Sequence, residues 1–399
     1  MPSRTTTTTA IAATTDFNNA FADKRLNIKT ALQESEPLVS YAGVKIVLTK
    51  LMAASSLGQL LSLCHSAKAL WCEARNSAKN VGESGLHRAS HPPRYRRLNL
   101  VLLAVMASLT IGGLVVLPLW LLPTDARWGW LLVPLALLTN FFWALHHEAI
   151  HGGFHEDRRR NLMAGRLMAV LLGSSFHVLR FGHLMHHQYN RNPIDRPDVY
   201  DPAVTPQLKA RLGFIGTLVF GLYFAEIAAP LGCCLPRAAI RRIIDRVYRG
   251  DDPALAAIRL AAQRQFLDRR RLRTIRIDVV LAWTLIGGSA IAFGAYWPML
   301  AGFLLGRGTM ISVFDNVYHF GTPIDRPEYA RNLQLPTPLR LLILNMNLHR
   351  LHHARPSLPW WELPAQFRAE RDRYDAGLLR TAAAQFAGPV AITHLPRID

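Results

Sequence analysis

The sequence predicts an all-α integral membrane protein, in which four transmembrane helices form two hairpins beneath a cytoplasmic helical cap. Three observations lead to this prediction: long apolar runs, arginine-rich connections between them, and histidines that recur with helical spacing. Half of the 399 residues are hydrophobic and only 18% are charged, with a mean hydropathy of +0.12. This composition excludes a disordered chain, and four cysteines are too few for a disulfide scaffold.

Two pairs of apolar runs have the length of membrane spans. The first pair is Asn99–Pro123 and Gly129–Leu145, and the second pair is Ile277–Tyr296 and Trp297–Val313. Because a helix rises about 1.5 Å per residue, such runs cover all or most of a hydrocarbon core of about 30 Å. The linker within each pair is short, which predicts two helical hairpins.

Arginine-rich segments predict the topology. Pro236–Arg276 carries 12 arginines against four aspartates, and Arg158–Arg211 is also basic. Positively charged loops stay in the cytoplasm, so both segments and both termini are expected there. Arg211–Leu235 lies between them and therefore should not cross the membrane; we expect an interfacial helix or a re-entrant hairpin. We attribute the net charge of +19 to loops that face anionic membrane lipid, with no nucleic-acid partner.

Composition divides the chain into three parts. Residues 1–93 open with a threonine-rich low-complexity stretch and have no span, which indicates a poorly ordered region. Residues 94–370 hold the apolar runs and the histidine clusters, and residues 371–399 form a C-terminal tail.

The histidines fall into clusters with helical spacing. The clusters read HEAIH from His147, HLMHH from His183 and HRLHH from His349, and His319 follows the last apolar run. Residues at i, i+3 and i+4 share one face of a helix, so each cluster can direct two or three imidazoles at one point. The acidic residues Asp195 and Asp198 follow the second cluster.

The number of clustered histidines predicts two metal ions. One ion with four to six ligands would leave at least three of the nine unused. Imidazole suits iron, zinc, copper and nickel, but zinc has no redox chemistry. Two ions with open coordination positions at the mouth of a membrane bundle suit activation of O2 by iron. The predicted ligands are His147, His151, His183, His186, His187, His319, His349, His352 and His353.

A different interpretation of the first cluster is a protease. His147-Glu148-Ala-Ile-His151 also fits H-E-x-x-H, in which two histidines bind zinc and the glutamate is the general base. Such a site needs one further ligand, which leaves the later clusters without a role. An intramembrane zinc metalloprotease is therefore a remote alternative.

The motifs resemble the integral-membrane fatty acid desaturase superfamily, whose members carry three histidine boxes at the cytoplasmic ends of two helical hairpins. The boxes here are HEAIH, HLMHH and HRLHH, and the resemblance runs from about Arg94 to about Pro364. Asn161 follows the first box, in HGGFHEDRRRN, and NMNLHRLHHARPSLPWWELP has a shape seen in bacterial members. DNVYHFGTP resembles the segment that supplies an extra ligand histidine and an asparagine near the metal, for which Asn316 or Asp315 is the candidate.

The resemblance implies a non-haem di-iron oxidase that uses O2 as co-substrate. Removal of two vicinal hydrogens from an acyl chain makes a C=C bond, the reaction expected here. The same boxes serve acyl or carotenoid hydroxylases and fatty acid decarboxylases that release a terminal alkene. The substrate is expected as a free acid or bound to CoA, acyl carrier protein or lipid. No donor domain is fused, so a ferredoxin, cytochrome b5 or reductase must supply electrons.

The resemblance also suggests residues around the ligands. Polar side chains that orient an imidazole through its other ring nitrogen are expected close to the boxes. The candidates are Glu148, Asn190, Asp195, Asp198, Asn316 and Asn347. Arg180, Arg191 and Arg350 lie near the boxes in the sequence and are candidates to hold a carboxylate, phosphate or headgroup.

Overall fold

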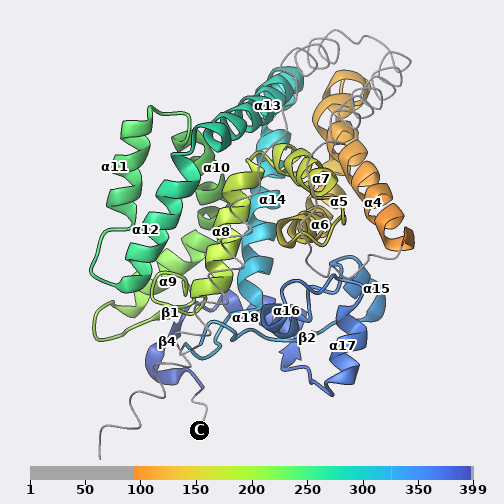
Figure 1. Ribbon diagram of the computed structural model, residues 1–399. Helices are drawn as coiled ribbons and strands as arrows, with labels where there is room; N and C mark the ends of the chain where they lie inside the picture. Colours follow the sequence, from red (N-terminus) through yellow and green to blue (C-terminus); the bar gives the residue numbers. More distant parts are fainter. Residues whose placement is uncertain (1–92, 325, 397–399) are drawn as a thin grey trace, which may run out of the picture. The chain divides into compact units, whose positions relative to one another are not determined.

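The computed structural model describes residues 93–324 and 326–396, which are mainly helical (Figure 1). The low-complexity region predicted for residues 1–93 thus lies, apart from its last residue, outside the described residues. The helices form a bundle that carries the histidine clusters near one end.

The first apolar run forms one long helix. α4 (Pro93–Ile111) continues as a π-helical segment, Gly112–Leu121, which contains Pro118. Proline has no amide hydrogen to donate, and a helix that contains one commonly changes its hydrogen-bond register. The chain then returns through a 3₁₀ helix, Ala126–Leu131, into α5 (Leu132–Leu137) and α6 (Thr139–His151). α6 ends at Gly152, whose φ of +79° is the left-handed conformation in which helices often end.

α7 (Arg158–Leu171) and α8 (Phe176–Tyr189) form a pair bent by 99°. α7 begins shortly after the first histidine cluster, and α8 carries the second cluster. Polar side chains inside the bundle hold the chain at the bend. The Arg307 guanidinium donates hydrogen bonds to the carbonyls of Leu171 and Leu172 at the end of α7. The Asp278 carboxylate accepts hydrogen bonds from Ser175 and Arg166.

For Arg211–Leu235, between the two arginine-rich regions, we expected either an interfacial helix or a re-entrant hairpin, and the structure differs from the second. α9 (Gln207–Gly216), a π-helical turn (Thr217–Gly221) and α10 (Leu222–Gly232) form one continuous helical stretch that packs beside α14. The re-entrant hairpin is therefore wrong. Glu226 and Pro230 suggested a break, but the helix tolerates both, and Pro230 lies close to its end.

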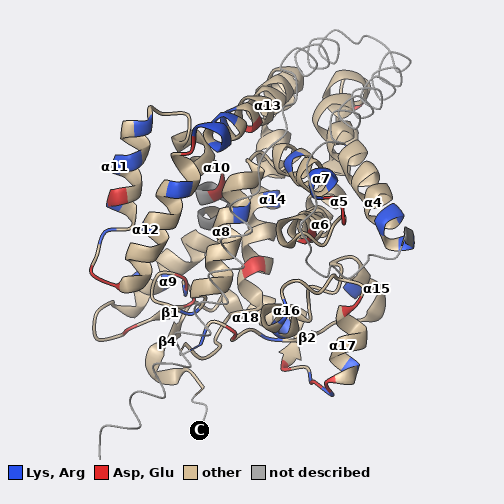
Figure 2. Cartoon of the chain, viewed as in Figure 1, with Lys and Arg blue, Asp and Glu red and all other residues tan. Residues whose placement is uncertain are grey.

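The arginine-rich region forms two helices and the start of a third. α11 (Arg237–Val247) and α12 (Pro253–Phe266) precede α13 (Arg269–Phe293), and Figure 2 shows basic segments along all three. On α11, Ile240 and Ile244 are buried and the arginines are exposed.

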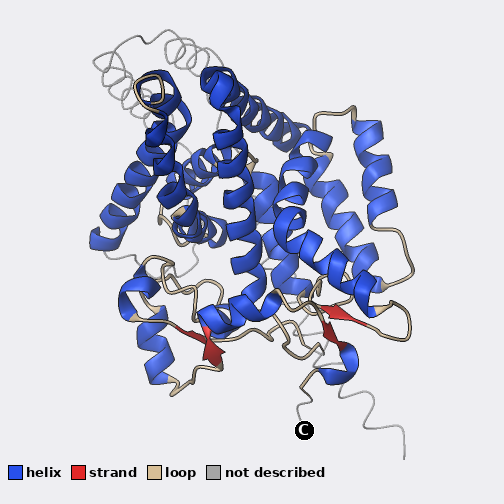
Figure 3. Ribbon diagram, turned by 180° about the vertical axis from the view of Figure 1, so that it is seen from behind, coloured by secondary structure: helices blue, strands red, loops and turns tan. Residues whose placement is uncertain are grey.

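α13 and α14 (Trp297–Val317) meet at a short 3₁₀ turn, Gly294–Tyr296. Gly294 has a φ of +49° and a ψ of −120°, a conformation that a residue with a Cβ atom would adopt only with strain. Figures 1 and 3 show the two helices leaving this turn in different directions.

The apolar helices support a membrane protein. By length and composition, the described part of the chain contains two candidate spans, Arg94–Leu121 and Arg269–Val317. There are up to four if each of two bent pairs counts as one span: Ala126–Leu137 with Thr139–His151, bent by 40°, and α7 with α8. The arrangement of four spans in two hairpins stays a prediction.

Short helices and strand pairs follow α14. The helices are α15 (Thr337–Leu341), α16 (His349–Ala354), α17 (Leu363–Ala369), α18 (Leu378–Gln385) and a 3₁₀ turn, Ile392–His394. β1 (Val199–Tyr200) pairs in parallel with β4 (Val390–Ala391), and β2 (Leu333–Gln334) pairs in parallel with β3 (Ala376–Gly377) (Figure 3). The residues after 370 thus pair with loops that adjoin the second and third clusters.

Candidate metal centre

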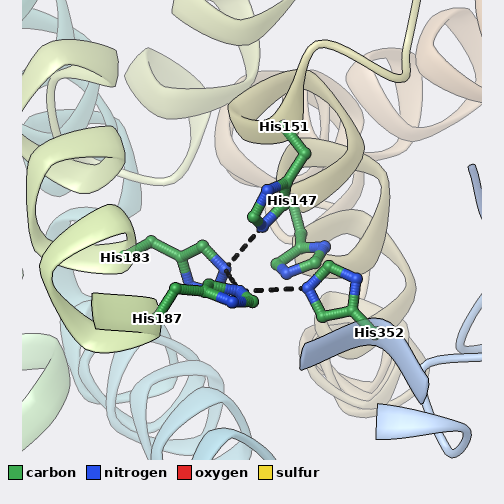
Figure 4. Close-up of side chains that lie close together, drawn as sticks. All are labelled: His147, His151, His183, His187 and His352. Carbon is green, nitrogen blue, oxygen red and sulfur yellow. Dashed lines mark hydrogen bonds between the residues drawn. The ribbon is translucent and has the colours of Figure 1, made fainter. Parts of the chain in front are cut away.

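The four histidine-bearing segments meet at one end of the bundle. α6, α8 and α16 carry the three boxes, and the turn after α14 carries the remaining histidine. The imidazoles form two groups, and within each group the nearest ring nitrogens lie within 4.8 Å of one another. The first group is His147, His151, His183, His187 and His352 (Figure 4), and the second is His186, His319, His349 and His353.

The first group brings Nε2 atoms of different helices face to face. The Nε2 atom of His183 lies 2.9 Å from that of His151 and 3.0 Å from that of His187. The Nε2 atom of His187 also lies 3.1 Å from that of His352. Both ring nitrogens of His147 are buried, and neither has a hydrogen-bond partner among the described residues.

Hydrogen bonds alone cannot satisfy this chain of nitrogens. A ring nitrogen either carries one proton or offers one lone pair. If His183 accepts from both neighbours, the Nε2 atom of His187 is a donor and must divide its single proton between His183 and His352. A cation among the rings removes this conflict, because every Nε2 atom can then present a lone pair.

In the second group, hydrogen bonds show which ring nitrogen of two histidines carries the proton. His186 donates from Nδ1 to the Asp195 carboxylate at 2.7 Å, and His319 donates from Nδ1 to the Tyr329 carbonyl at 3.2 Å. In the neutral rings these bonds leave lone pairs on both Nε2 atoms, which face each other at 3.1 Å. Two facing lone pairs repel unless a proton or a metal ion lies between them.

The residues fit metal ions by spacing, charge and ligand type. With a metal–nitrogen bond of about 2.1 Å, two ligands at right angles have nitrogens about 3.0 Å apart, close to the observed separations. Burial, and then the proximity of other histidines, holds the pKa of His349, His352 and His353 well below its ordinary value. These rings are therefore neutral at physiological pH, which is the form that binds metal.

The acidic and amide residues after the second box support its loop in different ways. Asp195 contacts the second group directly, as described above. Asn190 donates to the carbonyls of Pro327 and Tyr329, and so holds the carbonyl that orients His319. Among the described residues, the Asp198 carboxylate contacts groups other than histidine. It pairs with buried Arg191 at 2.7 Å and accepts from the backbone of Gly321, two residues after His319.

The other three predicted supporting residues also contact groups other than imidazoles. The Glu148 carboxyl is buried beside the backbone of Trp360, and its Oε2 atom has no hydrogen-bond partner among the described residues. Asn316 donates to Gln385 of α18 at 2.6 Å. Asn347 donates to the Leu333 carbonyl at 2.8 Å, which joins the third box to β2.

Two of the three candidate cations are already paired with acids. Arg191 binds Asp198, and Arg350 binds Asp372 at 2.5 Å and Asp375 at 2.6 Å. Arg180 donates to the carbonyl of Ile150 in the first box.

Sequence reasoning missed two contacts close to the centre. The Tyr329 carbonyl is a backbone group, so no residue type marks it. Trp143 donates from its indole to Asp315 at 2.7 Å. Helical spacing offered a signal here, because Trp143 and Asp315 each precede a predicted ligand by four residues.

Comparisons with known proteins agree with this geometry. Residues 126–383, more than half of the chain, match the family described as fatty acid desaturase. A sunflower (Helianthus annuus) protein, the chloroplastic sn-2 acyl-lipid omega-3 desaturase (ferredoxin), is 30% identical over 107 residues. That match covers 26% of this chain and 24% of the sunflower protein, so the chain matches about a quarter of its relative's length. The chain therefore belongs to the fatty acid desaturase family.

Proposed function

We propose that this protein is a membrane-bound, O2-dependent di-iron oxidase that introduces a C=C bond into a fatty acyl chain. The observation that carries the proposal is the pair of histidine groups, five and four imidazoles, whose ring nitrogens converge. Membership of the desaturase family supports the same chemistry.

The nine histidines would hold two irons, one in each group. Bound iron would supply an oxidant made from O2 and two electrons, strong enough to remove hydrogen from an unactivated C–H bond. The overall reaction converts –CH2–CH2–, O2, two electrons and two protons into –CH=CH– and two waters. The protein's task is to keep the imidazoles neutral and to hold the acyl carbons beside them.

The surrounding polar residues would fix the rings. Asp195 sets the tautomer of His186, and Asn190 acts on His319 through the Tyr329 carbonyl. Asp198, Asn316 and Asn347 hold the backbone that carries the ligands. Glu148 does the same through Trp360. Such partners typically change metal affinity or activity 10- to 100-fold.

The substrate and the electron donor are separate molecules in this proposal. The acyl chain arrives as a free acid or attached to CoA, acyl carrier protein or lipid. A ferredoxin is the first donor to test, because the name of the sunflower relative includes one; a cytochrome b5 or a reductase would serve the same purpose.

The geometry favours desaturation over the alternatives. Decarboxylation needs a cation that holds the carboxylate beside the metals. Arg191 and Arg350 pair with acids, and Arg180 donates to the carbonyl of Ile150. Hydroxylation would use the same centre and differs only in the fate of oxygen. For a zinc protease, Glu148 would have to act at the metal, whereas its carboxyl is buried against the backbone of Trp360.

A perdeuterated saturated fatty acid separates these reactions. Cells that express the protein should yield a product of unchanged chain length that has lost two deuteriums, as measured by gas chromatography and mass spectrometry. A product one carbon shorter with a terminal vinyl group would instead establish decarboxylation. Incorporation of labelled oxygen from O2 would establish hydroxylation.

A further inference from the structure

A hydrogen bond crosses the bundle one helical turn away from the metal-binding histidines. Trp143 precedes His147 by four residues on α6, so both side chains lie on one face of that helix. Asp315 precedes His319 by four residues, near the end of α14. The 2.7 Å bond between the Trp143 indole and the Asp315 carboxylate therefore joins the two helices just inside the bundle.

Trp143 is a fixed barrier rather than a mobile side chain. Its side chain is 7% exposed and its ring centroid lies 5.5 Å from that of buried His146. The indole cannot rotate without breaking its hydrogen bond to a charged group in an apolar bundle, where such groups are costly and tend to be functional.

Beyond this bond the bundle is closed. The cavity there holds about 10 Å³, room for about one water molecule. Five of the eight residues that line it are apolar, and the others are two threonines and an arginine: Met106, Leu135, Phe142, Leu172, Phe303, Thr110, Thr139 and Arg307. Arg307 is 2% exposed and is held by the carbonyls at the end of α7. A chain that passes the metal centre in this direction meets a filled, mostly apolar core.

We propose that Trp143, held by Asp315, is the stop that limits how far the methyl end of the substrate extends past the metal centre. The inference rests on the proposed function and adds a determinant of chain length and double-bond position. We assign the methyl end of the acyl substrate to this side of the metal centre because the closed core there is mostly apolar. Removing the indole should open space, and each methylene that enters it should tighten binding about fourfold.

The first test uses metal-free protein and displacement of a fluorescent fatty acid by saturated acids of increasing length. Trp143→Ala should shift the preferred length upward by several carbons. Trp143→Phe, which keeps the bulk without the hydrogen bond, and Asp315→Ala should shift it less. Phe141→Ala is the matched control, because residue 141 points away from the face shared by Trp143 and His147.

The second test measures products of the iron-loaded protein. The double bond made by Trp143→Ala should move away from the methyl end, whereas that of Phe141→Ala should stay where the wild type places it. If Trp143→Ala keeps the length preference and product position of the wild type, the stop is refuted. A wild type that binds acyl chains with the predicted length profile but makes no oxidised product refutes the proposed function instead.

Discussion

When both rings are neutral, His186 and His319 present facing lone pairs that repel each other, and contacts behind the rings hold them in that arrangement. Asp195 and the Tyr329 carbonyl occupy their Nδ1 atoms, and the Nε2 atoms lie 3.1 Å apart. The protein therefore stores an arrangement that favours a bound cation. Removing a ligand imidazole and removing the side chain that orients one should therefore have different effects on metal binding.

Removal of one ring should empty one metal position. Purified with iron available, the wild type should contain about two irons per chain, and His349→Ala should retain about one, because His349 belongs only to the second group. The measurements are metal analysis and the yield of oxidised product, which should be lost. His394→Ala, at an exposed position, should change neither. A single zinc that His349→Ala leaves in place would contradict the di-iron proposal.

Removal of the support should weaken binding rather than abolish it. Asp195→Ala frees the His186 ring to rotate and to change tautomer, so iron affinity should fall about 10- to 100-fold. A competition titration against a chelator measures this. Asp201→Ala is the matched control, because Asp201 is exposed and its carboxylate accepts from the backbone of Ala203 in its own loop. Equal affinities for the two variants would show that Asp195 does not orient the ring.

At the scale of elements, the third box is tied to the segment after it. Arg350, next to His349, binds Asp372 and Asp375, and Asn332 joins the same two acids to the backbone of Leu351. Burial alone would raise the pKa of Asp372, but hydrogen bonds from Arg350 and its neighbours hold that pKa below its ordinary value.

This tie predicts a pH-dependent stability. A carboxyl with a lowered folded-state pKa stabilises the protein above its unfolded-state pKa, and that contribution is lost as pH falls through the folded-state value. Asp372→Asn should therefore lower the free energy of unfolding by about 1 kcal/mol at neutral pH. Melting curves of the variant and the wild type should converge at acid pH. A constant difference at every pH would exclude the ionised pair as the cause.

The elements also show what sequence can and cannot predict. The spacing within HLMHH and HRLHH predicted that the imidazoles of each cluster point to one place. The i, i+4 pairs do so, because His183 and His187 share one group and His349 and His353 share the other. The middle residues, His186 and His352, belong to the opposite group. The α7–α8 bend was not predictable, because the side chains that hold it, Arg307 and Asp278, lie more than a hundred residues later in the sequence. The re-entrant hairpin, one of the two alternatives for Arg211–Leu235, was wrong because the acidic Glu226 in that apolar run does not break the helix.

At the scale of the whole molecule, the side of the membrane occupied by α11 and α12 is the open question. The stretch from α9 to α10 is about 39 Å long at about 1.5 Å per residue, enough to cross a bilayer. A crossing would separate the arginine-rich helices from the histidine groups. Two contacts argue against separation: Phe266 of α12 packs on Phe181 of α8, two residues before His183, and Arg237 binds the Leu267 carbonyl.

We therefore expect Gly250, in the connection between α11 and α12, to lie in the cytoplasm with the histidine groups. The arginine excess on these helices favours the same side. A reporter inserted after Gly250 in the full chain should match one inserted after Asp201, an exposed residue of the loop that follows the second box. Both should show cytoplasmic activity. Opposite signals would mean that the α9–α10 stretch crosses the membrane, and two external signals would place the metal centre on the outer face.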